Sequence, residues 1–76
     1  MTFGEKIRCL REDMEPKLTQ EELGKKCGMS QRKISRLETN IYEPSLDDIK
    51  VLCDFFKVSA DYLIGVQKGY NYPDRR

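Results

Sequence analysis

The sequence contains no histidine and no tryptophan, and only three cysteines. Without histidine, the chain lacks both the commonest general base and the commonest metal ligand. Cys9, Cys27 and Cys53 are odd in number and form no Cys-x-x-Cys pair, so they predict neither a disulfide framework nor a zinc site. There is also no glycine-rich phosphate loop and no clustered pair of carboxylates that the sequence would place facing a cleft. The sequence therefore predicts a protein that is not an enzyme and that uses no metal or other cofactor.

Long apolar runs are missing as well. No stretch approaches the ~20 apolar residues of a membrane span, and the start of the chain lacks the basic and apolar parts of a secretory signal. The 76 residues, 38% hydrophobic and 36% charged, have the composition of one small soluble domain. We therefore expect a cytoplasmic protein with no membrane partner and no small-molecule substrate.

Acidic residues are absent from a central segment. Between Lys25 and Arg36 the chain carries five basic residues and no acidic one, whereas residues 37–61 carry six acidic residues against two lysines. The formal net charge of +1 hides this contrast. A compact basic patch on a neutral or acidic body is typical of a protein that docks one side onto a phosphate backbone. Charge alone is equally typical of the solvated faces of two helices, so the wider pattern has to decide.

That pattern predicts an all-α fold. Apolar residues recur at helical spacing, several of these stripes begin at a Ser/Thr-x-x-Asp/Glu capping box, and no segment alternates as a strand would. We expect residues 1–65 to form the domain and residues 66–76 to form a C-terminal tail without helical period. The predicted helices cover residues 3–14, 20–27, 31–38 and 46–56, with one or two further turns between residues 58 and 65.

The second and third predicted helices are separated by a tight turn. Gly28 accepts the left-handed backbone that ends a helix, and Ser30 is a good N-cap for the next one. The two helices must therefore cross steeply, which predicts a helix-turn-helix. If Ile34 and Leu37 face the core, the opposite side of the third helix forms a polar surface, which we call the reading face. The reading face consists of Gln31, Arg32, Ser35 and Arg36.

Arginine and glutamine side chains can make paired hydrogen bonds to guanine and adenine edges in the major groove of DNA, which is wide enough to admit a helix. The reading face therefore predicts base contacts, against the alternative of an ordinary solvated helix surface. Lys25, Lys26 and Lys33 lie beside it in sequence, and lysine suits phosphate contact because it is a compact point charge. Surface lysines are common, so for Lys25 and Lys26 a solvated role is equally compatible with the sequence.

Residues 19–31, TQEELGKKCGMSQ, are followed by ISRLE at residues 34–38 and by Pro44-Ser45. Together these segments resemble the lambda-repressor-like, or Cro-type (XRE family), helix-turn-helix transcriptional regulators. The resemblance covers about residues 5–65 and implies a five-helix DNA-binding domain that acts as a dimer, with Tyr62 and its neighbours near the subunit contact.

The resemblance also implies individual roles. Gln20 is expected to contact a phosphate and to brace Gln31, Ser35 to lie at the floor of the groove, and Glu38 to be structural within the domain. Together with the basic segment, this leads to a set of predicted phosphate contacts. These are Gln20, Lys25, Lys26, Lys33 and Asn40.

Three positions depart from the family pattern. Gly24 stands where a packed alanine is usual, and glycine inside a helix costs ~0.5–1 kcal/mol, so we expect a less stable second helix. Asn40 replaces a common glycine, but asparagine tolerates the left-handed conformation, so the turn should be preserved. Pro16 lies in a first connection that is slightly longer than usual, away from the reading face.

The sequence therefore predicts a sequence-specific transcriptional regulator, a repressor, that binds double-stranded DNA. We expect a homodimer in which each subunit places its third predicted helix in a major groove, with the two grooves about 34 Å apart. Two alternatives stay open. One is the antitoxin of a toxin–antitoxin pair, which would bind DNA and hold a toxin with its tail. The other is a protein-interaction module that has kept the fold and lost DNA binding.

Overall fold

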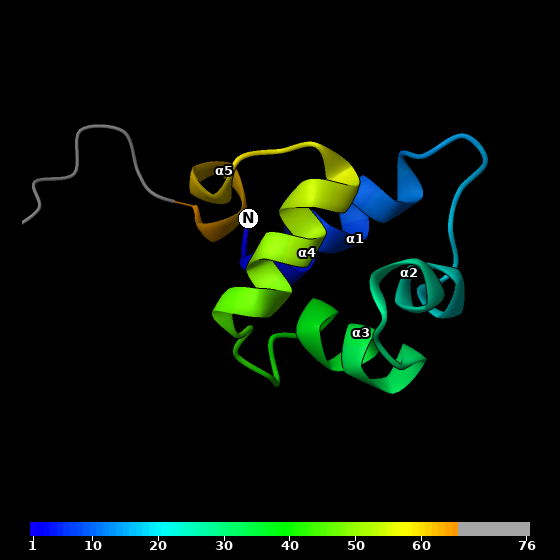
Figure 1. Cartoon of the computed structure of the whole chain (residues 1–76), viewed down its shortest axis with the longest axis horizontal. Coiled ribbons are helices and arrows are strands. Elements are labelled where there is room, and N and C mark those ends of the chain that lie inside the picture. Colours follow the sequence, from blue (N-terminus) through cyan, green and yellow to red (C-terminus); the bar gives the residue numbers. More distant parts are fainter. Residues whose placement is uncertain (66–76) are drawn as a thin grey trace, which may run out of the picture.

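The computed structural model describes residues 1–65, and the predicted tail lies outside the described residues. Residues 1–65 form five α-helices and no strand (Figure 1), which confirms the all-α prediction. The helices are α1 (Phe3–Glu12), α2 (Gln20–Cys27), α3 (Gln31–Glu38), α4 (Leu46–Phe56) and α5 (Ala60–Ile64).

The first helix is shorter than its apolar spacing predicts, because α1 ends at Glu12 and not at residue 14. The carbonyl of Arg11 accepts hydrogen bonds from the amides of Met14 and Leu18, at 3.4 and 3.3 Å, so the chain turns back at the end of α1. The apolar periodicity continues past this point, but the backbone hydrogen bonds do not.

Each helix begins at a hydroxyl side chain that accepts a hydrogen bond from a backbone amide. Complete capping boxes start α1, α2 and α4, as the sequence predicts. Ser30 and Ser59 cap α3 and α5 by accepting from the amides of Lys33 and Tyr62. An N-cap of this kind typically contributes about 1 kcal/mol, which is substantial for helices this short.

The core is small, and every helix contributes to it. Six aliphatic side chains have no solvent-exposed surface, two from α3 and one from each other helix. They are Ile7, Leu23, Ile34, Leu37, Leu52 and Leu63. Because α2 and α3 share this core with the other three helices, their relative orientation depends on the whole domain.

In Figure 1, α1 and α4 lie in the middle of the domain, with α5 on one side and α2 on the other. The α3 helix runs along the lower edge of this view. The Lys6 ammonium of α1 donates to the Tyr62 carbonyl of α5 at 2.7 Å and joins these two helices. This arrangement leaves one side of α3 without a covering helix among the described residues. None of the five helices has the length and apolar character needed to cross a membrane.

Candidate nucleic-acid interface

The connection between α2 and α3 is the tight turn that the sequence predicts. Gly28 ends α2 in the left-handed conformation, with a φ of 72°, and its amide donates to the Gly24 carbonyl. The Met29 amide donates to the same carbonyl at 2.8 Å. Ser30 then caps α3, so three residues separate the two helices. This is a helix-turn-helix whose second helix is α3.

Gly24 has a role that its helix propensity does not reveal. A Cβ atom at this position would overlap the backbone carbonyl of Met29. The missing side chain therefore lets the turn close tightly against α2. Glycine at this position lowers the helix propensity of α2, as predicted, but the packing requires it. Alanine does not fit here unless the turn moves.

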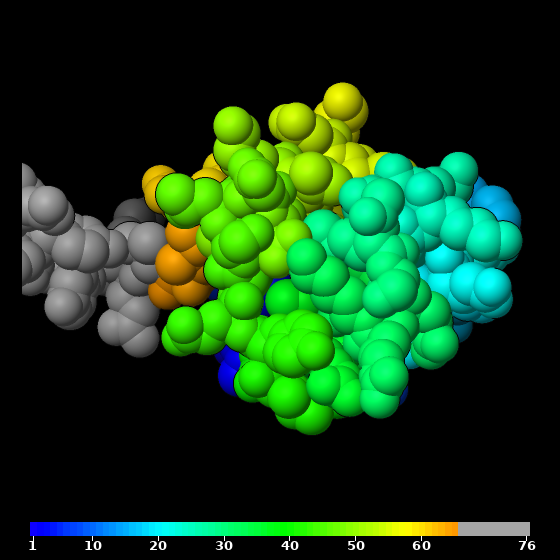
Figure 2. All heavy atoms as spheres, turned by 60° about the horizontal axis from the view of Figure 1, so that its bottom comes forward, coloured from blue at the N-terminus to red at the C-terminus, as the bar shows by residue number. Residues whose placement is uncertain are grey.

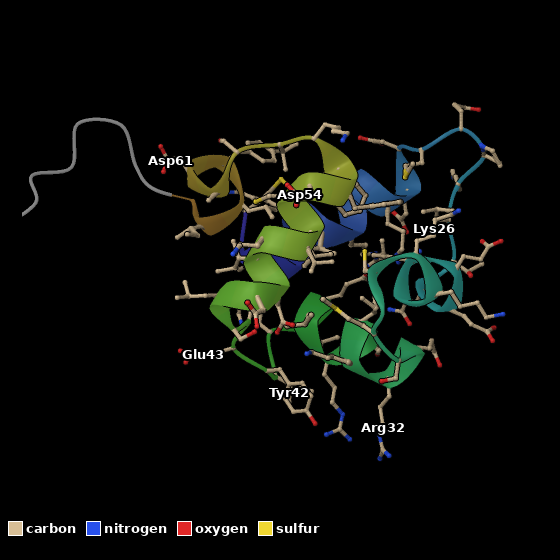
Figure 3. All side chains as sticks on the ribbon, viewed as in Figure 1. Lys26, Arg32, Tyr42, Glu43, Asp54 and Asp61 are labelled. Atoms are coloured by element: carbon tan, nitrogen blue, oxygen red, sulfur yellow. The ribbon has the colours of Figure 1, made fainter. Side chains whose placement is uncertain are left out.

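The reading face lies on the uncovered side of α3. Gln31 and Arg32 are exposed, whereas Ser35 and Arg36 are partly buried. In Figure 3, Arg32 extends away from the body of the domain on the same side as Tyr42. Figure 2 turns this side toward the reader, and α3 and the loop after it form a convex surface there. A convex helix surface with outward arginine and glutamine has the shape and chemistry to enter the major groove.

A buried ion pair lies behind the reading face. Arg11 Nε and Nη2 donate to the two carboxylate oxygens of Glu38 at 2.7 and 2.9 Å, and Nη1 donates to the Leu18 carbonyl at 2.9 Å. The side chains are 11% and 3% exposed. The hydrogen bond to Glu38 is the main cause that raises the pKa of the Arg11 guanidinium. The structural role that the resemblance implies for Glu38 is confirmed, and the partner is a residue 27 positions away.

Hydrogen bonds of two glutamines connect this ion pair to the reading face. Gln20 Nε2 donates to a Glu38 oxygen at 3.0 Å, and Gln31 Nε2 donates to Gln20 Oε1 at 3.0 Å. This confirms that Gln20 braces Gln31. Both polar atoms of the Gln20 side-chain amide therefore have partners, and Gln20 holds Gln31 at one end of the reading face.

The predicted phosphate contacts do not all lie together. Lys25 and Lys26 are exposed at the end of α2. Figure 3 shows Lys26 on the side of α2 opposite to Arg32, so the structure does not bring Lys26 to the reading face. Gln20, by contrast, contacts Gln31 directly.

Lys33 and Asn40 are both engaged within the domain. Lys33 Nζ donates to Asp48 Oδ1 at 2.8 Å and joins α3 to α4. Burial of the Asp48 carboxylate raises its pKa, but the hydrogen bonds from Lys33 and Ser45 outweigh this effect and keep the pKa below its ordinary value.

Asn40 holds the loop after α3 against the start of α1. Its Oδ1 accepts from the Gly4 amide at 3.0 Å, and its Nδ2 donates to Thr2 Oγ1 at 2.9 Å. Its φ of 62° confirms the predicted left-handed conformation. Both polar atoms of the side chain therefore have partners inside the domain.

Tyr42 belongs to this site, although the sequence does not single it out. Its hydroxyl accepts from Arg36 Nη1 at 3.2 Å, and the guanidinium carbon lies 5.3 Å from the ring centroid. The available signal is an aromatic residue two positions after Asn40. That signal is weak, because the contact depends on how the loop folds back.

Residues 1–65 contain no cluster of candidate metal ligands. No group of three histidine, cysteine, aspartate or glutamate side chains there could hold a metal ion. The polar groups of α3 are instead suited to hydrogen bonding with another molecule.

Comparisons with known proteins agree with this geometry. A family described as helix-turn-helix matches residues 7–63. A crystal structure of the P22 c2 repressor in complex with synthetic operator 9T is similar, with a TM-score of 0.76 and 34% identity over 84% of this chain and 94% of that chain. The solution structure of the DNA-binding domain of the P22 c2 repressor has a TM-score of 0.74 and 32% identity, over 93% and 92% of the two chains. No curated protein sequence matches this chain significantly.

Proposed function

The chain belongs to the helix-turn-helix family, and from this premise we propose that it is a sequence-specific DNA-binding regulator that represses transcription. The observation that carries the proposal is the reading face, where α3 presents Gln31, Arg32 and Arg36 outward from a side that no described helix covers. The similar P22 c2 repressor was solved with a synthetic operator, which supports the same kind of partner for this chain.

In this proposal α3 enters the major groove of double-stranded DNA. Gln31, Arg32 and Arg36 contact base edges, and Ser35 lies at the floor of the groove. The bond between Gln31 and Gln20 supports this role. A side chain that is already held loses less freedom on binding, and ordering a free one costs about 0.5–1.5 kcal/mol.

Phosphate contacts orient α3 in the groove without reading sequence. Gln20 is well placed for this role because it contacts the reading face. If Lys33 contacts a phosphate, its ammonium must donate to Asp48 and to the phosphate at the same time. Its three N–H donors allow this. We propose the following phosphate-contacting set: Gln20, Lys25, Lys33 and Asn40. Lys26 is excluded because it lies on the side of α2 opposite to Arg32.

We propose further that the active form is a homodimer, and that a second copy of the chain covers an apolar hollow lined by residues of α1, α4, α5 and the loop after α3. The hollow has a volume of about 370 Å³, and Ile64 in its lining is 54% exposed. Symmetric dimers present two α3 helices at the spacing of successive major grooves. The hollow is lined by Phe3, Glu43, Pro44, Ile49 and Ile64.

Light scattering of the purified chain tests the dimer. Ile64→Asp places a charge in the hollow and should shift the protein toward monomer. Ile41→Asp is the control, because Ile41 is 68% exposed on the loop after α3 and does not line the hollow. A wild-type protein that is monomeric both free and on DNA would contradict the dimer.

Selection of bound duplexes from a random pool tests DNA reading. We expect one sequence motif to be enriched, and Arg36→Ala to lose about 1–3 kcal/mol at one base pair of that motif. Lys33→Ala should instead weaken binding to all duplexes and flatten the slope of log affinity against log salt by about one unit. If the pool yields no motif, the chain does not read DNA, and a protein-interaction module becomes the better account of the fold.

A further inference from the structure

Arg36 is held at the edge of the reading face by a residue from the following loop. Tyr42 accepts a hydrogen bond from Arg36 Nη1 at 3.2 Å, while the guanidinium lies over the ring at 5.3 Å. The tyrosine is 43% exposed, so the pair lies at the surface and is accessible to a partner. Two different interactions, one directional and one with the ring face, therefore restrain the same guanidinium.

The loop that carries Tyr42 is itself fixed. The amides of Ile41 and Tyr42 both donate to the Arg36 carbonyl, at 2.9 and 3.3 Å, so the loop folds back onto the last turn of α3. The Asn40 side chain joins the same loop to the start of α1, because it donates to the Thr2 hydroxyl and accepts from the Gly4 amide. The loop that carries Tyr42 is thus bonded to both α3 and the start of α1, so the position of Tyr42 is fixed by these two helices.

The contact with Tyr42 leaves one edge of the guanidinium available. Arginine carries five N–H donors in a planar fork, and a paired contact with guanine uses two parallel donors. The hydroxyl of Tyr42 accepts from Nη1, so the Nε and Nη2 edge can still donate to the O6 and N7 atoms of a guanine. A free arginine would have to lose side-chain freedom on binding, and the pair with Tyr42 restricts that freedom beforehand.

We propose that Tyr42 is a positioning residue that sets the base preference of Arg36, by holding Nη1 so that the Nε–Nη2 edge faces a guanine. This inference rests on the proposed function and deepens it. Tyr42 acts through Arg36, and it is not itself a base-contacting residue.

The test compares the full chain with Tyr42→Phe, which keeps the ring and removes the hydroxyl, and with Tyr42→Leu, which removes both interactions. Tyr62→Phe is the matched control for the NMR measurement on the free protein, because it makes the same chemical change on α5. Ile41→Ala is the control for DNA affinity, because Ile41 is 68% exposed on the same loop and its backbone bond to the Arg36 carbonyl is kept. Affinities are measured for the duplex selected by the wild type and for duplexes altered at one base pair at a time.

Tyr42→Phe should reduce the preference for guanine at one base pair by about two- to tenfold, the value of one hydrogen bond, and leave the other positions unchanged. Tyr42→Leu should reduce it further. In an Arg36→Ala background, neither change should have any additional effect at that base pair. In the free protein, the NMR signal of the Arg36 Nε–H group should shift in Tyr42→Phe and stay in place in Tyr62→Phe.

The outcomes separate this inference from the proposed function. If the wild type selects a motif but Tyr42→Phe keeps the full guanine preference, the role of Tyr42 is overturned and the proposed function stands. If Tyr42→Phe weakens all duplexes equally, Tyr42 contacts the DNA backbone itself, which also overturns positioning. If the wild type selects no motif, both the proposed function and the role of Tyr42 are overturned.

Discussion

Replacement of Glu38 by alanine should destabilise the domain more than any surface change. The carboxylate is 7% exposed as a residue and accepts two hydrogen bonds from Arg11 and one from Gln20. Without it, the Arg11 guanidinium, whose side chain is only 11% exposed, keeps its charge and donates to the Leu18 carbonyl alone of its former partners. Leaving one charge of a buried pair without its partner typically costs about 3–5 kcal/mol.

That cost is large for a chain of this size. At roughly 0.05–0.15 kcal/mol per residue, the total free energy of unfolding is about 4–11 kcal/mol. We therefore expect Glu38→Ala to lower the melting temperature by on the order of 20 °C, or to leave the chain unfolded at room temperature. Urea unfolding followed by far-ultraviolet circular dichroism measures the difference, because α-helices contribute all the regular structure of residues 1–65.

Two further variants show whether the unpaired charge of Arg11 causes the loss of stability in Glu38→Ala. Glu12→Ala removes the ion pair with Arg8, whose side chains are 64% and 44% exposed, and should cost no more than about 0.5 kcal/mol. The double change Arg11→Met with Glu38→Leu removes both buried charges and should recover most of the loss. If Glu38→Ala costs less than about 1 kcal/mol, or the double variant is no better than the single one, the buried-charge reasoning is wrong.

Three other changes test separate features of the fold. Gly24→Ala should destabilise the domain by about 1–3 kcal/mol despite the better helix propensity of alanine, because its Cβ would overlap the Met29 carbonyl; a higher melting temperature would contradict the close approach. Lys57→Gly should raise the free energy of unfolding by about 0.5–1 kcal/mol, because Lys57 ends α4 in the left-handed conformation with a φ of 59°; urea titration measures it, and a loss would contradict the prediction. The pKa of Asp48 is held below its ordinary value, so its contribution to stability is present above about pH 3.9 and is lost as the pH falls through the lowered folded pKa. Asp48→Asn should therefore flatten the loss of stability in that acidic range, and an unchanged acid profile would show that the pair with Lys33 contributes nothing.

The local features of the fold could be predicted from the sequence because they depend on neighbouring residues. The capping boxes determine where α1, α2 and α4 begin, since the hydroxyl and the amide it accepts from are three positions apart. The left-handed conformations of Gly28 and Asn40 follow from the residue types themselves. The division of α3 into a buried side and the reading face follows from helical spacing alone.

Tertiary structure alone decided which distant groups meet around that face. Arg11 pairs with Glu38 across 27 positions, and Lys33 pairs with Asp48 across 15. The sequence does not indicate that Arg11 is the partner of Glu38, or Asp48 the partner of Lys33, because a charge pattern does not say which helices will lie side by side. The contact between Tyr42 and Arg36 likewise requires the loop to fold back onto α3. Helical spacing selects the side chains that point outward, and the packing of all five helices determines how firmly each of them is held.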